Sequence, residues 1–599
     1  MSYISDQVSL EPNSLDPINS MFEAKSLLGL NLGDIEIRAF YFDCVDNRYR
    51  LINQTTSYAT FTSPRKNVWI HVLNTIYNLQ NLIGVKLLDD DHHLIQPVQS
   101  NGVGVDQIVG TTSAGSPLKI IILGLVDQQS ISSAIHLANS TYCGELVIID
   151  LHASQDRATQ IDTLLQTQPD IIIVCGGFNE GATKSVFHLF ETVSMACQLM
   201  ATYDRPIILY SGNQTIQDKI KSTYENLLDI RFASNIRPAS NTEDIDSAMD
   251  ILADITKEIK IQQNPHIGIL DELTKKTLLP TSPALGRVIK FLSKARTSDK
   301  GVLGLTIDSS SVTIASSYNG ILSLNTFTEL GLGRNLQYLL ESDAIKNINL
   351  WLNMDVPINH VKAYLLNKQI QPISVPATDE DLAIELALAR HLIQTAIKKS
   401  SNAQPTKLTT FGYQIPPVEP IISAGDIFTH VPNLAHSMLV LLDGFQPLGA
   451  TTFVLDQYHL AGVLGAAAEV NPTLTIQVLD SNAFLHLGTI VSPIGLAKIG
   501  SPILRASMID ENGYEIRTEL NLGSIEVLPL AADSSATLTL HPLQKFDVGM
   551  GGPGIGGKLK VKGGAMGVVL DGRGRPIILP KDPEERYQRF QNWLRALKV

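Results

Sequence analysis

Residues 302–317, VLGLTIDSSSVTIASS, consist of two apolar runs separated by a serine-rich turn, and they continue through Asn319-Gly320 into a third run, ILSLNTF. Asn-Gly between apolar runs is a strong signal for a tight hairpin, so this stretch predicts three consecutive antiparallel strands. The same layout occurs earlier, where SLLGLNLG, IEIRAFYFDCV and YRLIN follow one another over residues 26–53. We therefore predict that the chain contains two halves built on one plan.

Length, composition and charge bound the class of protein. The 599-residue chain is 44% hydrophobic and 18% charged, which suits about three or four globular units. Its net charge of −13, without a cluster of Lys and Arg, argues against binding to nucleic acid or anionic lipid. The polar start reads as a loose leader without a secretory signal. Because no apolar run is long enough for a membrane-spanning helix, we expect a cytoplasmic protein.

The hydrophobic pattern of the sequence changes at residue 116. Short, wholly apolar runs (LKIIILGL, ELVIIDL, DIIIVCGG and PIILYSG) alternate there with helical patterns. Such runs are typical of a parallel sheet covered on both faces, so we predict an inserted doubly wound α/β unit. After residue 475 short runs, beginning with TIQVLD, predict a separate β-rich domain. The predicted division is leader 1–25, first half 26–115, insert 116–260, second half 261–474, β-rich domain 475–582 and final helix 583–599.

A glycine-rich segment near the C-terminus imitates a phosphate loop. VGMGGPGIGGKLK contains the spacing G-x-x-x-x-G-K at Gly552, Gly557 and Lys558. A phosphate loop needs Ser or Thr after the lysine and a helix after the glycines, whereas Leu559 and an alternating run follow here. We predict a hairpin loop at this position.

The turn after the first strand corresponds to a phosphate-binding position of actin, sugar kinases and the large heat-shock chaperones. There an apolar strand delivers Asp-x-Gly into a tight hairpin whose backbone N–H groups bind phosphate. In GLNLGDIEIRAF, Asn31 takes the place of that Asp and Gly33 is retained. Asp34 and Glu36 follow, and their charges would repel a triphosphate.

The equivalent turn of the second half, GLTIDSSSVTIA, lacks glycine between its strands. Thr306 stands at the Asp position, or Asp308 does if the register is moved by two residues. In either register the backbone freedom of glycine is missing. An ordinary strand–turn–strand and a phosphate site remain alternatives. The candidate nucleotide-binding residues of this turn are Asp308, Ser309, Ser310 and Ser311.

Two further segments offer binding residues. IISAGDIF places Ser423 and Gly425 where the adenosine side of a nucleotide would lie, although Asp426 also fits a helix N-cap. In the insert, Gly176 and Gly177 follow an apolar strand at the carboxyl edge, where open α/β sheets bind ligands. Short turns need glycine for geometric reasons as well, so a ligand site and a plain turn remain alternatives there.

The sequence predicts no metal site. His92 and His93 follow three aspartates in DDDHHL, a pattern that fits a solvated turn better than a metal site. None of the four cysteines forms a C-x-x-C pair, so we read them as reduced thiols.

From about residue 26 to its end, the chain resembles the glutamate mutase L family. The resemblance rests on GVGVDQIVGTTSAGSPLKIIILGL, PDIIIVCGGFNEGA, RPIILYSGN, NIRP, LGRVIKFL, LLDGFQPLGATTFVLD, LGTIVSPIG and AMGVVLDGRGRPIILP, in that order. It implies an actin/hexokinase-type (ASKHA) ATPase related to reactivating chaperones. It also implies ATP with Mg²⁺ as cofactor and a cobamide-dependent mutase, such as glutamate mutase, as protein partner. The D-x-H-x-x-G signature of cobalamin-binding proteins is absent from the sequence.

The chain departs from that family where phosphate would lie. Asn31 replaces Asp in the first loop, Thr306 and Asp308 replace Asp and Gly in the second, and Asn179 replaces Asp in the insert. Our first hypothesis is an accessory, chaperone-like protein with weak or absent catalysis. The alternatives are an active reactivase-type ATPase with Asp308 at the metal, and a small-molecule-binding protein that uses the insert around Gly176 and Gly177.

Overall fold

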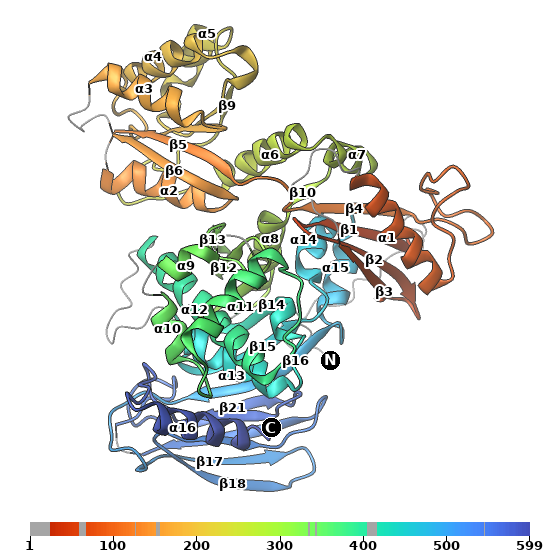
Figure 1. Ribbon diagram of the computed structural model, residues 1–599, viewed down its shortest axis with the longest axis vertical. Coiled ribbons are helices and arrows are strands. Elements are labelled where there is room, and N and C mark those ends of the chain that lie inside the picture. The colour runs from red at the N-terminus through yellow and green to blue at the C-terminus, as the bar shows by residue number, and fades with distance from the viewer. Residues whose placement is uncertain are drawn as a thin grey trace.

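The computed structural model describes residues 24–58, 68–125, 127–150, 156–296, 298–333, 336–341, 344–403, 416–543 and 545–598. The expected leader, 1–25, lies outside these residues except for its last two. The described chain is elongated, with a parallel α/β unit at one end and a strand-rich region at the other (Figure 1). The two halves of the core lie between these ends.

The first half is built on a five-stranded sheet with the order β10-β4-β1-β2-β3. β1, β2 and β3 form the predicted antiparallel meander, and β4 and β10 run parallel to β1. Helix α1 covers the sheet with the apolar face that its sequence predicts, burying Val72, Ile76 and Leu79. The elements are β1 (Ser26–Leu32), β2 (Glu36–Val45), β3 (Arg48–Tyr58), α1 (Val68–Ile83), β4 (Gln107–Thr112) and β10 (Leu279–Pro280).

The second half is built on an eight-stranded sheet with the order β13-β12-β11-β14-β15-β16-β22-β19. β11, β12 and β13 repeat the meander, and Asn319 and Gly320 have the positive φ values, 52° and 80°, that an Asn-Gly hairpin turn requires. β14 and β15 continue the sheet in parallel with β11. The elements are α8 (Thr281–Lys294), β11 (Gly301–Ile307), β12 (Val312–Tyr318), β13 (Ile321–Phe327), α9 (Leu336–Glu341), α10 (Ala344–Leu350), α11 (Ile358–Ile370), α12 (Asp379–Ala403), β14 (Val418–Ala424), η5 (Asp426–Phe428), α13 (Leu434–Phe445), β15 (Gly449–Asp456) and α14 (Leu460–Val470).

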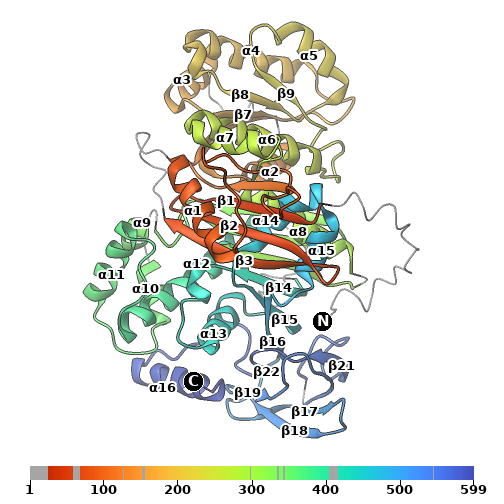
Figure 2. The ribbon, with the colours of Figure 1, turned by 90° about the vertical axis from the view of Figure 1, so that its right-hand side faces the viewer.

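The insert is a wholly parallel sheet with the order β6-β5-β7-β8-β9. Helices lie on both of its faces (Figures 1 and 2), because its strands are apolar on both sides. The chain then returns through α6 and α7 to β10 of the first half. The elements are β5 (Leu118–Gly124), η2 (Asp127–Ile131), α2 (Ser132–Asn139), β6 (Cys143–Asp150), α3 (Arg157–Thr167), β7 (Ile171–Val174), α4 (Lys184–Leu199), η3 (Thr202–Asp204), β8 (Ile207–Tyr210), η4 (Gln214–Ile216), α5 (Gln217–Tyr224), β9 (Ile230–Phe232), α6 (Asp246–Gln263) and α7 (Pro265–Leu273).

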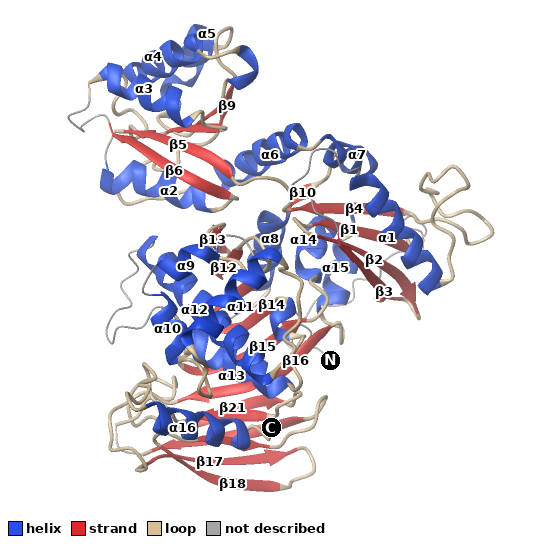
Figure 3. Cartoon of the chain, viewed as in Figure 1, coloured by secondary structure: helices blue, strands red, loops and turns tan. Residues whose placement is uncertain are grey.

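The region after residue 475 is strand-rich, but it is not separate from the core throughout. Three of its strands extend the eight-stranded sheet, and four others form a second sheet with the order β18-β17-β20-β21. These strands lie at the lower end of the molecule in Figure 3, beside the last helix. The elements are β16 (Phe484–Ser492), β17 (Pro502–Asp510), β18 (Glu515–Asn521), β19 (Ile525–Leu528), β20 (Ser535–Pro542), β21 (Gly557–Lys562), β22 (Val568–Asp571) and α16 (Pro583–Ala596).

The strand predicted at TIQVLD is wrong, because these residues belong to helix α15 (Pro472–Leu479). The side chain of Asn471 accepts a hydrogen bond from the Leu474 N–H at 3.0 Å, and Pro472 occupies the first turn. Asn followed by Pro is a helix start that outweighs the β-branched residues after it.

A buried ion cluster fastens the C-terminal region to the second half. Asp443 of α13 accepts hydrogen bonds at 2.6 Å from both Arg390 and Arg573. Arg573 also pairs with Asp571 at 2.9 Å and lies over the ring of Trp593 in α16. The segment AMGVVLDGRGRPIILP therefore has a structural role in this fold.

The chain is thus an α/β protein with an actin/hexokinase-like core. Each half starts with the same antiparallel meander and adds parallel strands beside it. The doubly wound insert and the strand-rich C-terminal region complete the predicted fold class.

Candidate functional site

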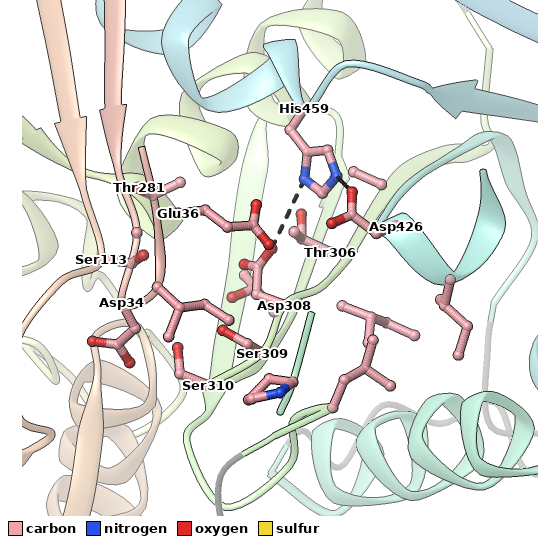
Figure 4. Close-up of a pocket in the computed structure, with 18 of the residues that line it drawn as sticks. Asp34, Glu36, Ser113, Thr281, Thr306, Asp308, Ser309, Ser310, Asp426 and His459 are labelled. Carbon is pink, nitrogen blue, oxygen red and sulfur yellow. Dashed lines mark hydrogen bonds and ion pairs between the residues drawn. The ribbon is translucent and has the colours of Figure 1, made fainter. Parts of the chain in front are cut away.

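A cleft lies between the two halves, at the turns that follow β1 and β11. Figure 4 shows side chains from both turns pointing into it, together with Asp426 and His459 from the second half. The two turns are the candidate phosphate loops of the sequence analysis, and residues of both line the cleft. Its geometry therefore tests the sequence predictions directly.

The first turn keeps its hairpin geometry but not its chemistry. The Gly33 N–H donates to the Glu36 carbonyl at 2.8 Å, which closes the turn. Asn31 accepts a hydrogen bond from the Thr281 hydroxyl at 3.4 Å, and Asp34 accepts one from the Gly115 N–H at 3.2 Å. Asn31, Gly33 and Asp34 all line the cleft, but the two side chains already bind protein groups.

A chain of ion pairs crosses the cleft between the halves. Arg38 of β2 pairs with Glu36 on its own strand and with Asp426 of η5, at 3.0 and 3.2 Å from the two carboxylate oxygens. His459, just before α14, lies 3.1 Å from Asp426 on the other side. Because Arg38 and Asp426 come from different halves, their pairing links the two halves directly.

The N-cap interpretation of Asp426 is wrong. Gly425 is the residue that precedes η5, it makes no side-chain cap, and the Asp426 side chain turns instead to Arg38 and His459. Sequence reasoning missed Arg38 and His459 as members of the site. The signal for Arg38 was its position directly before the apolar run AFYF in a predicted strand. An arginine that is buried with such a strand requires a partner of opposite charge.

Burial and neighbouring charges set the protonation of these groups. Burial alone would raise the pKa of Asp426, but His459 and Arg38 hold it well below its ordinary value. Burial opposes the charge on Arg38, yet Glu36 and Asp426 raise its pKa above the ordinary value. We conclude that the Arg38–Asp426 pair is fully ionised at neutral pH.

Asp308 follows the opposite pattern. Burial raises its pKa to about 6, and the charge of Glu36 adds to this, while His459 opposes it. Figure 4 shows the carboxylates of Asp308 and Glu36 pointing toward each other below His459. The nearest His459 nitrogen lies 3.9 Å from Asp308, too far for a hydrogen bond.

The second turn is closed by its own backbone and by the segment that follows β13. The Asp308 N–H donates to the Ser311 carbonyl at 2.9 Å, and the Gly333 N–H donates to the Ser309 carbonyl at 2.9 Å. Ser309 and Ser310 line the cleft. Ser311 is buried and is not part of the cleft wall, so two of the three predicted serines line the cleft.

The third segment reaches the cleft with other residues than those predicted. Gly425 has φ +147°, and a Cβ there would lie 2.9 Å from the Ile307 carbonyl, so the close approach to β11 requires glycine. Ser423 is buried within β14, and Ala424 and Asp426 line the cleft in its place.

The insert also contributes to the cleft, through Tyr142. Its hydroxyl accepts a hydrogen bond at 3.1 Å from the Ser282 N–H, at the start of α8. Burial raises the pKa of Tyr142 above its ordinary value, so the phenol stays neutral. Its place between insert and core could not be predicted from sequence, because no local pattern links residues so far apart in the chain.

The space within the cleft is small, and charged side chains line it. The free volume of the cleft is about 80 Å³. A single buried water molecule needs about 10–15 Å³ on this scale, so the cleft has room for several water molecules. Glu36, Arg38 and Asp426 are among the residues that line it. Asp456, another carboxylate of the wall, accepts the N–H groups of Leu460 and Ala461 at 2.8 Å and thereby caps α14.

Gly176 and Gly177 lie in the insert and are not part of the cleft wall. Both have positive φ, and a Cβ on Gly177 would lie 2.8 Å from a backbone oxygen. The Asn235 side chain donates at 3.0 Å both to the Gly177 carbonyl and to the Asn179 side chain. Tight turn geometry therefore accounts for both glycines, and amide side chains fill the space beside them.

Other features of the described residues bear on function. Within these ranges no group of three or more His, Cys, Asp and Glu side chains could hold a metal ion, and the four cysteines are free. In the same part of the chain, no helix combines the length and the apolar character needed to cross a membrane.

Comparisons with known proteins give one family and several remote structures. A family model described as MutL protein matches residues 30–483. The curated proteins give no match. Nucleotide-free acetone carboxylase is 9% identical over 83% of this chain and 81% of its own, with a TM-score of 0.33.

Two more solved structures are similarly distant. The ATP-dependent caprolactamase from Pseudomonas jessenii is 11% identical over 82% of this chain and 81% of its own, with a TM-score of 0.30. The inorganic polyphosphate/ATP-glucomannokinase from Arthrobacter sp. strain KM is 11% identical over 74% of this chain and 98% of its own, with a TM-score of 0.24. Sequence identities and TM-scores this low do not support any conclusion about the function of this chain.

Proposed function

Because the chain belongs to the MutL protein family, that of glutamate mutase L and not of the mismatch-repair proteins of similar name, we propose that it is an accessory protein acting without ATP hydrolysis. The observation that carries this proposal is the Glu36–Arg38–Asp426 network across the cleft. It sets protein charges beside the two candidate phosphate loops and connects the two halves of the core.

Three further observations support an inactive cleft. Asn31 replaces the carboxylate of the first loop and is engaged by Thr281. Burial raises the pKa of Asp308 to about 6, so the charged carboxylate is less favourable there than in water. Glu36 adds a negative charge that would repel phosphate.

A cobamide-dependent mutase is the protein partner that we propose, because family members are associated with such enzymes. The chain would then act as a scaffold or chaperone-like subunit in the cytoplasm. The net charge of −13 favours a protein partner over nucleic acid.

Hydrolysis assays separate this proposal from an active ATPase. We expect purified protein with Mg²⁺ and ATP to release phosphate at the rate of the buffer control, and Asp308→Ala to leave that rate unchanged. Turnover well above the control that disappears in Asp308→Ala would establish the reactivase-type alternative instead.

The partner is tested separately by sedimentation of the full chain with the two subunits of a glutamate mutase. We expect a complex to form with or without ATP. A mixture that sediments as free components in both conditions would argue against the mutase, and a complex that requires ATP would argue against the inactive cleft.

A further inference from the structure

A binding space larger than the cleft lies elsewhere in the molecule. It is a cavity at the junction of the eight-stranded sheet and the four-stranded sheet, where β16 contacts β21. The cavity has a free volume of about 560 Å³, whereas the cleft has about 80 Å³. Small-molecule sites in proteins usually have volumes of about 300–1,000 Å³.

Strands and helix ends form the walls of this junction cavity. β14, β15 and β16 supply one wall, and the last residues of α8 and α15 supply a second. The turn before β20 and the segment after β21 supply the third. The apolar side chains that line it are Leu292, Ile422, Val454, Leu479, Phe484 and Leu485.

A packing defect does not account for a space of this size. Folded interiors pack as densely as organic crystals, and voids larger than one water molecule are few. Here the walls come from separate parts of the chain, among them β16 of the core sheet and the end of α15. A cavity built from well-formed strands and helix ends has the character of a pre-formed ligand site.

The polar groups of the cavity define the chemistry of a ligand. Arg296 and Lys562 carry positive charges, and Asp480 and Asp533 carry negative ones, so the cavity has no net charge. The two carboxylates offset the attraction that the two cations would exert on an anion. Burial lowers the pKa of His486 to about 4, so this residue is neutral at pH 7.

We propose that the junction cavity binds an uncharged small molecule with an apolar body and a hydrogen-bonding group. The apolar walls would take the body, and the mixed polar groups would take the other end. This site is independent of the cleft and of any nucleotide.

Fluorescence titration of the full chain tests the proposal. The probes are Nile red, which is uncharged, and anilinonaphthalene sulfonate, which is an anion. We expect saturable binding of one Nile red per chain, and weaker binding of the anion. Absence of saturable Nile red binding would overturn the site, and tighter binding of the anion would overturn the proposed ligand class.

Two matched variants locate the probe. Val454→Phe fills the cavity from β15 and should weaken Nile red binding at least tenfold. Val45→Phe makes the same change at an exposed end of β2, outside the cavity, and should leave binding unchanged. Equal affinities in both variants would refute the location.

A second filling variant guards against misfolding. If Val454→Phe does not melt at the temperature of the unaltered protein, Ala565→Leu at the exposed rim takes its place. We expect the same tenfold loss from Ala565→Leu, and unchanged binding would count against the site.

Discussion

Replacing Arg38 with alanine tests whether the ion pairs across the cleft hold the two halves together. The Arg38 side chain is 9% exposed, Glu36 is 18% exposed and Asp426 is 32% exposed. Removing one partner of a buried ion pair costs about 3–5 kcal/mol because the other charge stays buried. Since water reaches Asp426 in part, we expect the free energy of unfolding to fall by about 2–3 kcal/mol.

Urea unfolding followed by tryptophan fluorescence measures this loss. The three tryptophans, Trp69, Trp351 and Trp593, all lie outside the insert, so the signal reports on the core and its C-terminal helix. Arg505→Ala is the matched control, because its pair with Glu519 is 65% and 44% exposed and should contribute less than about 1 kcal/mol. Equal losses for Arg38→Ala and Arg505→Ala would refute the reasoning.

The pH dependence of the same comparison identifies the group involved. Because the pKa of Asp426 lies below its ordinary 3.8 in the folded state, its pairing stabilises the protein above that pH and is lost as the pH falls further. The difference between the unaltered protein and Arg38→Ala should therefore shrink below pH 3.8. A double-mutant cycle with Asp426→Asn should give a coupling of at least about 1 kcal/mol, and additive losses would show that the two residues act separately.

Three other predictions use the same unfolding assay. Asp443→Ala should cost about 3–5 kcal/mol, because it leaves Arg573 buried without this partner; a loss below about 1 kcal/mol would contradict the role of the buried cluster. Asp308→Asn should stabilise the protein at pH 7, because the raised pKa of about 6 means that ionised Asp308 is unfavourable in the folded state; the gain should vanish as the pH falls towards 3.8, and a gain that persists there would contradict this cause. Gly425→Ala should cost about 1–3 kcal/mol from strain and a backbone clash, and more than Gly500→Ala, whose added Cβ meets open space; equal costs would show that the close approach to β11 is unimportant.

Local patterns in the sequence predicted much of the fold. Asn319-Gly320 marked the hairpin of the second meander, and the wholly apolar runs after residue 116 marked a parallel sheet. These features depend on neighbouring residues, so one sequence suffices to find them. The strand predicted at 475–480 is wrong because the helix start at Asn471-Pro472 outweighs the β-branched residues that follow it.

At the cleft, contacts between residues far apart in the sequence limited what could be predicted. The sequence marked Asn31, Gly33, Asp308, Ser309 and Ser310 as candidate nucleotide-binding residues, and all five line the cleft. It could not show that Arg38 meets Asp426, because these residues are 388 positions apart and many carboxylates could have served as the partner. The same reason hid Tyr142, which the insert brings to the core.

Calorimetric titration of Mg²⁺ and ATP into the unaltered protein tests the central claim most directly. The ion pairs across a narrow cleft predict no saturable heat at ATP concentrations up to about 1 mM, which corresponds to a binding free energy weaker than about −4 kcal/mol. A stoichiometric isotherm with a micromolar Kd would contradict the account, because it would mean that ATP opens the Arg38–Asp426 pair and occupies the cleft.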